Sequence, residues 1–295
     1  MTLASLVIQG WSAPQAARLF GMADKEAAPA GWLSAAPALF AAMAAIVATG
    51  IVSFRVPDLP PDVVQTVELA PQSRIELAAA FAEGPVVIEQ LPPDWPSSSP
   101  DETDRVLFLK TAQSAVEAAN RRIASERAAI LRWMAIEAAG GEMSVYQQAE
   151  RDRIARRYGG RYRDLEALLV KVDQMPVDLV IAQAALATGW GTSSAARERN
   201  DLFARRPGAR FETLALSADD LLLYLNSHPA FDDLRAERAR LRNAGEPVSG
   251  EALLDLIGRY AGDGPSYLAQ LRAIRASGAF LVWQAEREPG EIGQD

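Results

Sequence analysis

Carboxylates are the side chains of this sequence that could carry acid–base chemistry. The 295 residues include no cysteine and a single histidine, His228. A thiol nucleophile, a zinc–thiolate site and a site with several histidines are therefore excluded, and a Ser-His-Asp triad is disfavoured. We expect no metal and no cofactor. One carboxylic acid can donate a proton while a second activates water, and the acids nearest to the most unusual motif are Glu198, Asp201 and Glu212.

That motif is an apolar helix followed by a tight turn, Gln183-Ala-Ala-Leu-Ala-Thr-Gly-Trp-Gly-Thr-Ser193. The segment Val177 to Thr188 is apolar on almost every side but too short to span a bilayer. We therefore expect it to be the buried central helix of a helical domain, with Pro176 in its first turn. Gly189-Trp190-Gly191 permits a sharp turn and offers a ring on which a sugar could stack.

Further helices are predicted before this motif. From Val106 the apolar residues follow 3-4 spacing and predict a long helix that ends at Gly140-Gly141. Ser144 to Tyr158 and Leu165 to Val172 are predicted to be shorter helices. Six arginines lie between positions 151 and 163. They could attract an anionic glycan or a membrane surface, but a solvated helix face paired with acids is the preferred interpretation.

The motif and its surroundings resemble the Bax-type glucosaminidase domain, a lysozyme-like peptidoglycan hydrolase related to the endo-β-N-acetylglucosaminidases. The likeness covers about Val106 to Ala285. The residues that carry it are Met175 to Ser193, Ala196, Asn200, Leu202, Phe203, Tyr224 to Phe231, Leu234, Arg235, Ser249-Gly250, Leu253, Tyr260 and Tyr267 to Ile274. The resemblance implies a mainly α, lysozyme-like helical domain.

The chain departs from this family where catalysis is expected. In the family a glutamate, the proposed general acid, follows the Gln-Ala-Ala-Leu helix, and here that position holds Ala187. Glycoside hydrolysis ordinarily needs an acid and a second carboxylate, and a methyl group can serve as neither. The family's Asn-Asn-Leu-Phe-Gly reads Asn200-Asp-Leu-Phe-Ala204, and the lobe after it is reduced to about Arg205 to Leu214. We therefore assign no catalytic residue.

Eight residues are candidates to line a glycan groove beside Ala187. They are Gln183, Thr188, Trp190, Ser193, Asn200, Phe203, Tyr260 and Tyr267. Trp190 and Phe203 could equally be core aromatics, and the two tyrosines could equally line a cleft or pack inside the domain. The resemblance places His228 at a structural helix corner.

The clearest segment outside the domain is Leu33 to Phe54, which contains 22 residues without a charge. As a helix it would span roughly 33 Å, enough for the hydrocarbon core of a bilayer. We predict a single transmembrane helix flanked by Trp32 and Arg55, with a cleaved signal peptide and a buried soluble helix as the alternatives. The flanking charges do not decide the orientation. The cell-wall resemblance implies a bacterial inner-membrane protein with a periplasmic C-terminal domain.

The predicted organisation has five parts. They are a tail over residues 1–30, a transmembrane helix over 31–55, a Pro-rich periplasmic linker over 56–105, the glucosaminidase-like domain over 106–285 and a C-terminal tail over 286–295. Inside the linker, Val63 to Leu69 and Pro85 to Ile88 could pair as strands, and Ser73 to Phe81 could form a helix. A plain tether is the preferred interpretation.

The net charge of −8 and the pI near 5.0 argue against a nucleic-acid partner. The expected partners are peptidoglycan or an envelope protein, together with the inner membrane. The preferred hypothesis is a membrane-anchored, inactive glucosaminidase-like protein of the bacterial cell envelope. The alternative is an active peptidoglycan β-N-acetylglucosaminidase that uses Glu198, Asp201 or Glu212 as a relocated carboxylate. A third hypothesis is a structural spacer.

Overall fold

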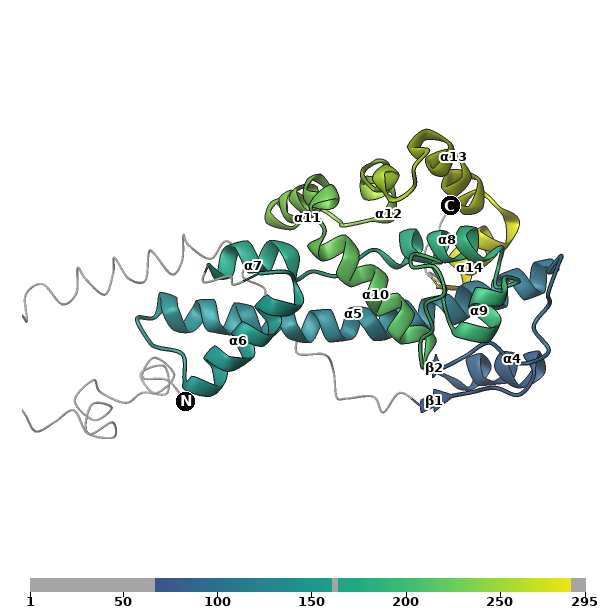
Figure 1. Cartoon of the computed structure of the whole chain (residues 1–295), viewed down its shortest axis with the longest axis horizontal. Helices are drawn as coiled ribbons and strands as arrows, with labels where there is room; N and C mark the ends of the chain where they lie inside the picture. Colours follow the sequence, from purple (N-terminus) through teal and green to yellow (C-terminus); the bar gives the residue numbers. More distant parts are fainter. Residues whose placement is uncertain (1–66, 161–163, 288–295) are drawn as a thin grey trace, which may run out of the picture. The chain divides into compact units, whose positions relative to one another are not determined.

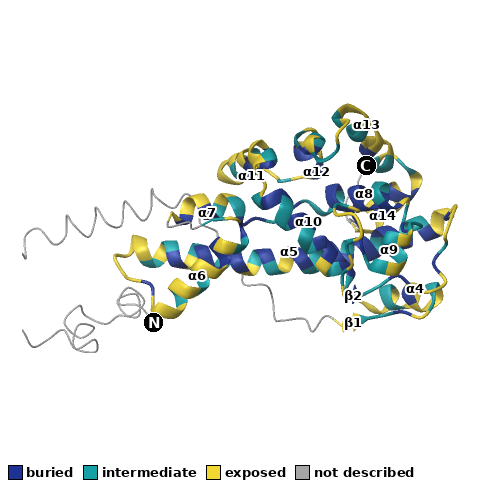
Figure 2. Cartoon of the chain, viewed as in Figure 1, coloured by how far each residue is buried: buried dark blue, intermediate teal, exposed yellow. Residues whose placement is uncertain are grey.

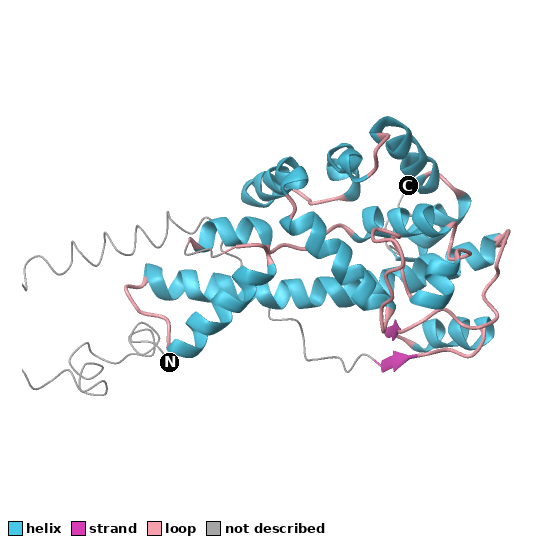
Figure 3. Ribbon diagram, in the orientation of Figure 1, coloured by secondary structure: helices cyan, strands magenta, loops and turns pink. Residues whose placement is uncertain are grey.

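The computed structural model describes residues 67–160 and 164–287, and the fold of this part of the chain is mainly helical, as predicted (Figure 3). The chain divides into two units, and the described residues all belong to the second, Pro61–Asp295. Within the described ranges no helix is both long and apolar enough to cross a membrane. The predicted transmembrane segment, Leu33 to Phe54, lies outside these ranges, as does the N-terminal tail.

Two short strands and a series of helices build this unit (Figure 1). The first part of the described chain forms β1 (Val67–Leu69), α4 (Arg74–Glu83) and β2 (Val86–Ile88). The remaining helices are α5 (Glu102–Ala138), α6 (Val145–Arg157), α7 (Leu165–Lys171), α8 (Val177–Thr188), α9 (Ser194–Arg199), α10 (Leu214–Ser227), η1 (Pro229–Phe231), α11 (Asp232–Ala244), α12 (Gly250–Leu253), η2 (Leu254–Tyr260), α13 (Gly264–Arg275) and α14 (Gly278–Arg287).

The short elements that could form inside the Pro-rich segment are present. Strands β1 and β2 pair in parallel, with Val67 opposite Val86. Between them, α4 begins at Ser73, whose hydroxyl accepts a hydrogen bond from the backbone N–H of Glu76. This cap satisfies one of the backbone donors that the first turn of a helix leaves unpaired. The parallel pairing needs a crossover, and α4 supplies it.

The Pro-rich segment is part of the domain from Val67 onward, not the plain tether that we preferred. Leu77, Ile88, Leu91 and Trp95 are each no more than 4% exposed and join the same core as the later helices. Burying such side chains contributes about 1.5–3 kcal/mol each, which outweighs the few backbone donors that the prolines remove. The boundary that we predicted at residue 106 therefore falls inside a packed unit.

Helix α5 is the longest helix among the described residues, and α8, α10 and α14 all pack against it. It begins at Glu102, four residues before the predicted start, because Asp101 and Asp104 form a reciprocal capping box. Gly140 follows its end, as predicted. Buried side chains run along α5 and through α8 (Figure 2). Helix α8 is therefore the buried central helix that its apolar sequence predicted.

Two arginines of α6 pair with acids from neighbouring helices, which supports the interpretation of a solvated, paired face. Arg157 donates to Asp219 of α10 at 2.5 Å, and Arg153 lies 3.5 Å from Glu126 of α5. Glu126, which interrupts the apolar stripe of α5, is buried and accepts a hydrogen bond of 2.8 Å from the hydroxyl of Tyr158. These contacts fasten α6 to α5 and α10.

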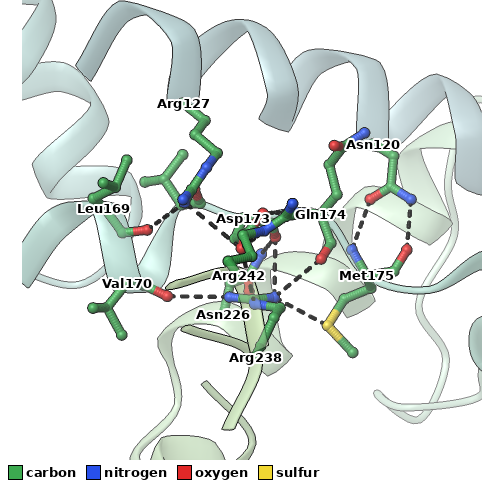
Figure 4. A network of polar contacts seen from close by, with 11 residues as sticks. Asn120, Arg127, Leu169, Val170, Asp173, Gln174, Met175, Asn226, Arg238 and Arg242 are labelled. Atoms are coloured by element: carbon green, nitrogen blue, oxygen red, sulfur yellow. Dashed lines mark hydrogen bonds and ion pairs between the residues drawn. The ribbon is translucent and has the colours of Figure 1, made fainter. Parts of the chain in front are cut away.

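A buried polar network, the Asp173 network, holds the connection between α7 and α8 (Figure 4). Its anion is Asp173, and its cations are Arg127, Arg238 and Arg242, whose guanidinium nitrogens lie 3.6, 3.5 and 2.5 Å from the carboxylate. Burial lowers the pKa of Arg238 to about 10, although Asp173 opposes that effect. The network brings together side chains of α5, α11 and the α7–α8 connection.

The same network also binds the backbone just before α8. Arg238 donates to the carbonyl oxygens of Val170, Asp173 and Gln174 at 3.1, 3.1 and 3.3 Å. Asn120 of α5 pairs in both directions with the backbone of Met175, at 2.8 and 3.0 Å (Figure 4). Because these bonds fix the chain up to the residue before Pro176, they set the position from which α8 begins.

Candidate functional site

The end of α8 is a turn in which three successive residues have positive φ. Gly189, Trp190 and Gly191 have φ angles of 57°, 61° and 81°. The hydroxyl of Thr188 donates to the carbonyl of Ala184 at 2.7 Å and accepts from the N–H of Gly191 at 2.8 Å. Thr188 was a candidate to line a glycan groove, but it is buried and its hydroxyl stabilises this turn instead.

Trp95 from the Pro-rich segment packs against the same turn. Its indole N–H donates to the carbonyl of Trp190 at 3.2 Å, and its ring lies near that of Phe108 on α5. A Cβ atom on Gly191 would lie 2.7 Å from the Trp95 nitrogen and 2.8 Å from the Phe108 ring. Only glycine fits there. The Trp190 ring is half-buried, and the guanidinium of Arg105 lies 5.5 Å from its centre.

Ala187 is half-buried on the last turn of α8. Residues four apart share one face of a helix, so Ala187 lies beside Gln183. The buried Gln183 amide donates to the hydroxyl of Tyr267 on α13 at 2.8 Å, and its Oε1 has no hydrogen-bond partner among the described residues. The face that carries Ala187 is therefore the face of α8 that meets α13.

Three tyrosines continue from Gln183 in an arrangement that we call the aromatic row: Tyr267, Tyr260 and Tyr224. The rings of Tyr267 and Tyr260 stack with their centres 5.7 Å apart, and Tyr224 meets Tyr260 edge-on at 6.4 Å. The guanidinium of Arg205 lies 4.6 Å from the centre of the Tyr224 ring and donates to Asp220 at 3.0 Å. Half-buried aromatic faces next to a cation form a surface suited to a polar ring such as a sugar.

The phenols of Tyr260 and Tyr267 stay protonated at neutral pH. Burial raises the pKa of Tyr267 to about 12, although the Gln183 hydrogen bond acts in the opposite direction. Burial also raises the pKa of Tyr260, helped by the proximity of Tyr267. Neutral phenols donate and accept hydrogen bonds but are poor bases. The row can therefore bind a ligand, but it does not provide the carboxylic acid chemistry that glycoside hydrolysis requires.

Two further groove candidates also bind the backbone. Ser193 begins α9 and its hydroxyl accepts from the N–H of Ala196 at 3.2 Å. Asn200 ends α9 with a φ of 53°, and its amide donates to the carbonyls of Phe211 and Glu212 at 3.3 and 3.0 Å. Both side chains therefore shape the loop, and the structure does not place them in the aromatic row.

Asp201, one of the three fallback acids, has a structural role as well. It is buried, and its Oδ1 accepts hydrogen bonds from the backbone N–H groups of Phe203 and Ala204 at 3.1 and 2.9 Å. Phe203 was a candidate for the groove or the core, and its ring is in the core with 3% exposure. Its carbonyl accepts a hydrogen bond of 3.1 Å from the hydroxyl of Tyr260, so the loop supports the aromatic row.

The shortened segment after Phe203 is a closed loop. Arg210 donates to the carbonyl of Glu198 at 2.6 Å, and the N–H of Phe211 donates to the carbonyl of Arg199 at 2.9 Å. These bonds tie the end of the loop back to α9. The fallback acids Glu198 and Glu212 are exposed, and neither carboxylate has a hydrogen-bond or ion-pair partner in the described part of the chain.

Sequence reasoning missed three contributors to this region, and His228 has the structural role that the resemblance implied. Trp95 lies in a segment interpreted as a tether, so no pattern linked it to α8. Tyr224 belongs to the resemblance, and Arg205 follows the Phe203 motif, but their contact depends on the folded loop. The ring of His228 accepts from the N–H of Ala230 at 3.2 Å and begins η1.

The fold and this site define a mainly helical domain whose apolar central helix ends in a glycine turn beside a row of tyrosines. No protein-family model matches the sequence, and no solved structure matches it either. The chain is 31% identical over 208 residues to Protein bax of Escherichia coli (strain K12), with 64% of this chain and 73% of that protein covered. This chain therefore belongs to the family of that protein.

Proposed function

We propose that the protein is a non-catalytic, glucosaminidase-like member of the Bax family that binds peptidoglycan or an envelope partner through Ala187 and the aromatic row. The observation that carries this proposal is the methyl group of Ala187 on the face of α8 that meets the row. An acid is missing where the resemblance expects one, while half-buried tyrosine faces remain for a glycan.

The arrangement of the fallback acids supports binding over cleavage. Asp201 is engaged by two backbone N–H groups, and Glu198 and Glu212 flank a closed loop. An active β-N-acetylglucosaminidase would have to recruit one of these acids, and no contact described above favours that second function. We retain it as the outcome that would overturn the proposal.

The location proposed for the protein is the bacterial inner membrane, with Leu33 to Phe54 as the single anchor and the C-terminal domain in the periplasm. The support is the length of this uncharged run. A reporter enzyme that is active only in the periplasm, fused after Asp295, should be active. A fusion that is active only with a cytoplasmic reporter would contradict the cell-wall function.

Binding is tested by sedimenting the full-length protein with purified peptidoglycan sacculi. We expect the wild-type protein to sediment with the sacculi and Tyr260→Ala to do so several-fold less. Tyr146→Ala is the matched control, because Tyr146 is an exposed tyrosine on α6. If both variants bind equally well, the aromatic row is not the glycan site. If the wild-type protein does not sediment, a photocrosslinking residue placed at position 267 should capture an envelope protein in cells. Failure of both the sedimentation and the crosslinking assay rejects the proposal.

Cleavage is tested with the same full-length protein in a peptidoglycan zymogram. We expect no clearing. Clearing that is abolished by Glu198→Gln, Asp201→Asn or Glu212→Gln would show that the protein is an enzyme with a relocated carboxylate.

A further inference from the structure

A second site lies outside the aromatic row, between the α4–β2 connection, α5 and α14. It is a cavity of about 230 Å³ with an apolar part and a charged rim. The apolar part includes Phe81, Val86 and Trp283, and the charged residues are Lys110, Glu117, Glu286 and Arg287. The proposed function assigns no role to any of these residues.

The walls of this cavity are held in place before any ligand arrives. The indole N–H of Trp283 donates to Gln113 at 2.7 Å, which fixes α14 against α5. The hydroxyl of Ser114 accepts from the N–H of Ile88 at 3.2 Å, which fixes β2 against α5. A preformed site binds small ligands at a lower entropic cost than one that must order on binding.

The charges of the cavity do not all cancel. Lys110 and Glu286 form an ion pair of 2.6 Å. The carboxylate of Glu117 accepts only from the neutral amide of Gln113, at 2.8 Å, and the guanidinium of Arg287 lies 5.6 Å from the centre of the Trp283 ring. Within residues 67–160 and 164–287, neither Glu117 nor Arg287 has an oppositely charged partner.

The backbone positions of these two residues lie toward opposite ends of the cavity. Lys110 of α5 contacts Glu286 of α14, and Gln113, one turn later on α5, contacts Trp283, one turn earlier on α14. The two helices therefore run antiparallel. Arg287 therefore lies near the Lys110 end. Glu117 follows Lys110 by seven positions, which is two helical turns or roughly 10 Å.

We propose that this cavity binds a short peptide with free termini, about three residues long. An extended chain covers about 3.3–3.6 Å per residue, so about three residues bridge roughly 10 Å. The peptide ammonium group meets Glu117, and its carboxylate meets Arg287 and Lys110. Small apolar side chains pack on Trp283 and Phe81. A carboxylate at an arginine and an ammonium at a glutamate are charge-assisted contacts, which are the strong ones.

The length and charge of the ligand are tested by calorimetric titration of the full-length protein with trialanine. We expect trialanine to bind, alanine to bind at least about tenfold more weakly, and N-acetyl-trialanine amide not to bind, because it lacks both charges. Absence of binding by trialanine up to about 10 mM would reject the site. Equal binding of the capped peptide would reject the roles of the two charges.

The assignment of the two ends is tested by variants with matched controls. Glu117→Gln keeps the amide contact but removes the charge, and we expect it to weaken trialanine binding about tenfold. Glu137→Gln is its control, since Glu137 is exposed at the far end of the same helix. Arg287→Ala should weaken binding similarly, with the exposed Arg259→Ala as control. An unchanged affinity in Glu117→Gln, or an equal loss in Glu137→Gln, would contradict the assignment.

Discussion

At its start α8 follows a chain segment held by charged side chains, whereas at its end it meets aromatic and small ones. Before the first turn, Arg238 binds three backbone carbonyls and faces Asp173, and both side chains are buried. After the last turn, Gly191 packs against Trp95, and the half-buried Ala187 lies on the face of α8 that carries Gln183. The two ends therefore constrain the same helix by different means.

This difference between the two ends of α8 distinguishes the residues that hold the helix in place from those that could bind a ligand. Substitution of one of the buried charged residues is strongly destabilising, because it leaves the opposite charge buried without a partner. At the other end Ala187 carries no charge, and the cations Arg105 and Arg205 lie against the aromatic rings of Trp190 and Tyr224. The start of α8 is therefore structural, and the end is where a binding function can reside.

The largest expected loss of stability comes from disrupting the contacts at the start of α8. Arg238→Met should destabilise the protein by about 3–5 kcal/mol, because the carbonyls before α8 lose their donor and Asp173 loses a buried cation. Arg240→Met on the same helix is the control, since Arg240 is exposed and its pairs with Glu237 and Glu246 lie in solvent. Urea unfolding measures both variants. Equal midpoints would show that the Asp173 network does not stabilise this part of the fold.

The next largest loss of stability comes from disrupting the turn at the end of α8. Gly191→Ala should cost about 2–4 kcal/mol, because the new methyl meets Trp95 and Phe108 and the positive φ is strained. Gly208→Ala has a similar φ of 74° with no atom within 4 Å of the new Cβ, so it isolates the backbone term at about 1–2 kcal/mol. Thermal unfolding of the two variants measures the difference between their stability losses. Equal losses would mean that the Trp95 side chain moves aside at little cost.

A smaller effect concerns the aromatic row and depends on pH. Tyr267→Phe should cost about 1 kcal/mol at neutral pH, because Gln183 loses its acceptor. The folded-state pKa of Tyr267 is raised to about 12, above the ordinary value of 10, so its contribution is present below pH 10 and is lost as the pH rises through about 12. The gap between wild type and variant should narrow over that range in urea unfolding. A constant gap would contradict the assigned pKa.

The smallest expected change in stability is at Ala187. Ala187→Glu should alter the free energy of unfolding by no more than about 0.5 kcal/mol, because the site is half-buried. We also expect no glycan cleavage, since hydrolysis needs a second carboxylate and Asp201 is committed to the backbone. Zymography of the full-length variant checks this, and clearing would show that the site lacks only one acid.

Local sequence patterns predicted the helices from α5 to α8, but none of those from α9 to α14. The 3-4 spacing and Gly140 gave α5 to within four residues, Ser144 predicted the start of α6, and Pro176 predicted the start of α8. Such signals need only neighbouring residues. The Pro-rich segment could not be assigned in this way, because the burial of Leu91 and Trp95 depends on helices that lie later in the chain.

The site was harder to predict for a related reason. Thr188, Ser193 and Asn200 are polar residues beside a motif, and a sequence does not distinguish a side chain that caps the backbone from one that binds a ligand. The contact between Gln183 and Tyr267 joins positions 84 residues apart, so it needs the tertiary fold. The alanine at position 187 could be singled out from the sequence, because that required only a comparison with the pattern of the family that the chain resembles.

The parallel pairing of β1 with β2 also has a mechanical consequence. Tension applied at Val67 enters the described fold through β1. Because β1 and β2 run side by side in the same direction, a pull along β1 loads their hydrogen bonds together in shear and does not open them one after another. A domain tethered through its N-terminal side would thereby resist detachment from its own first strand.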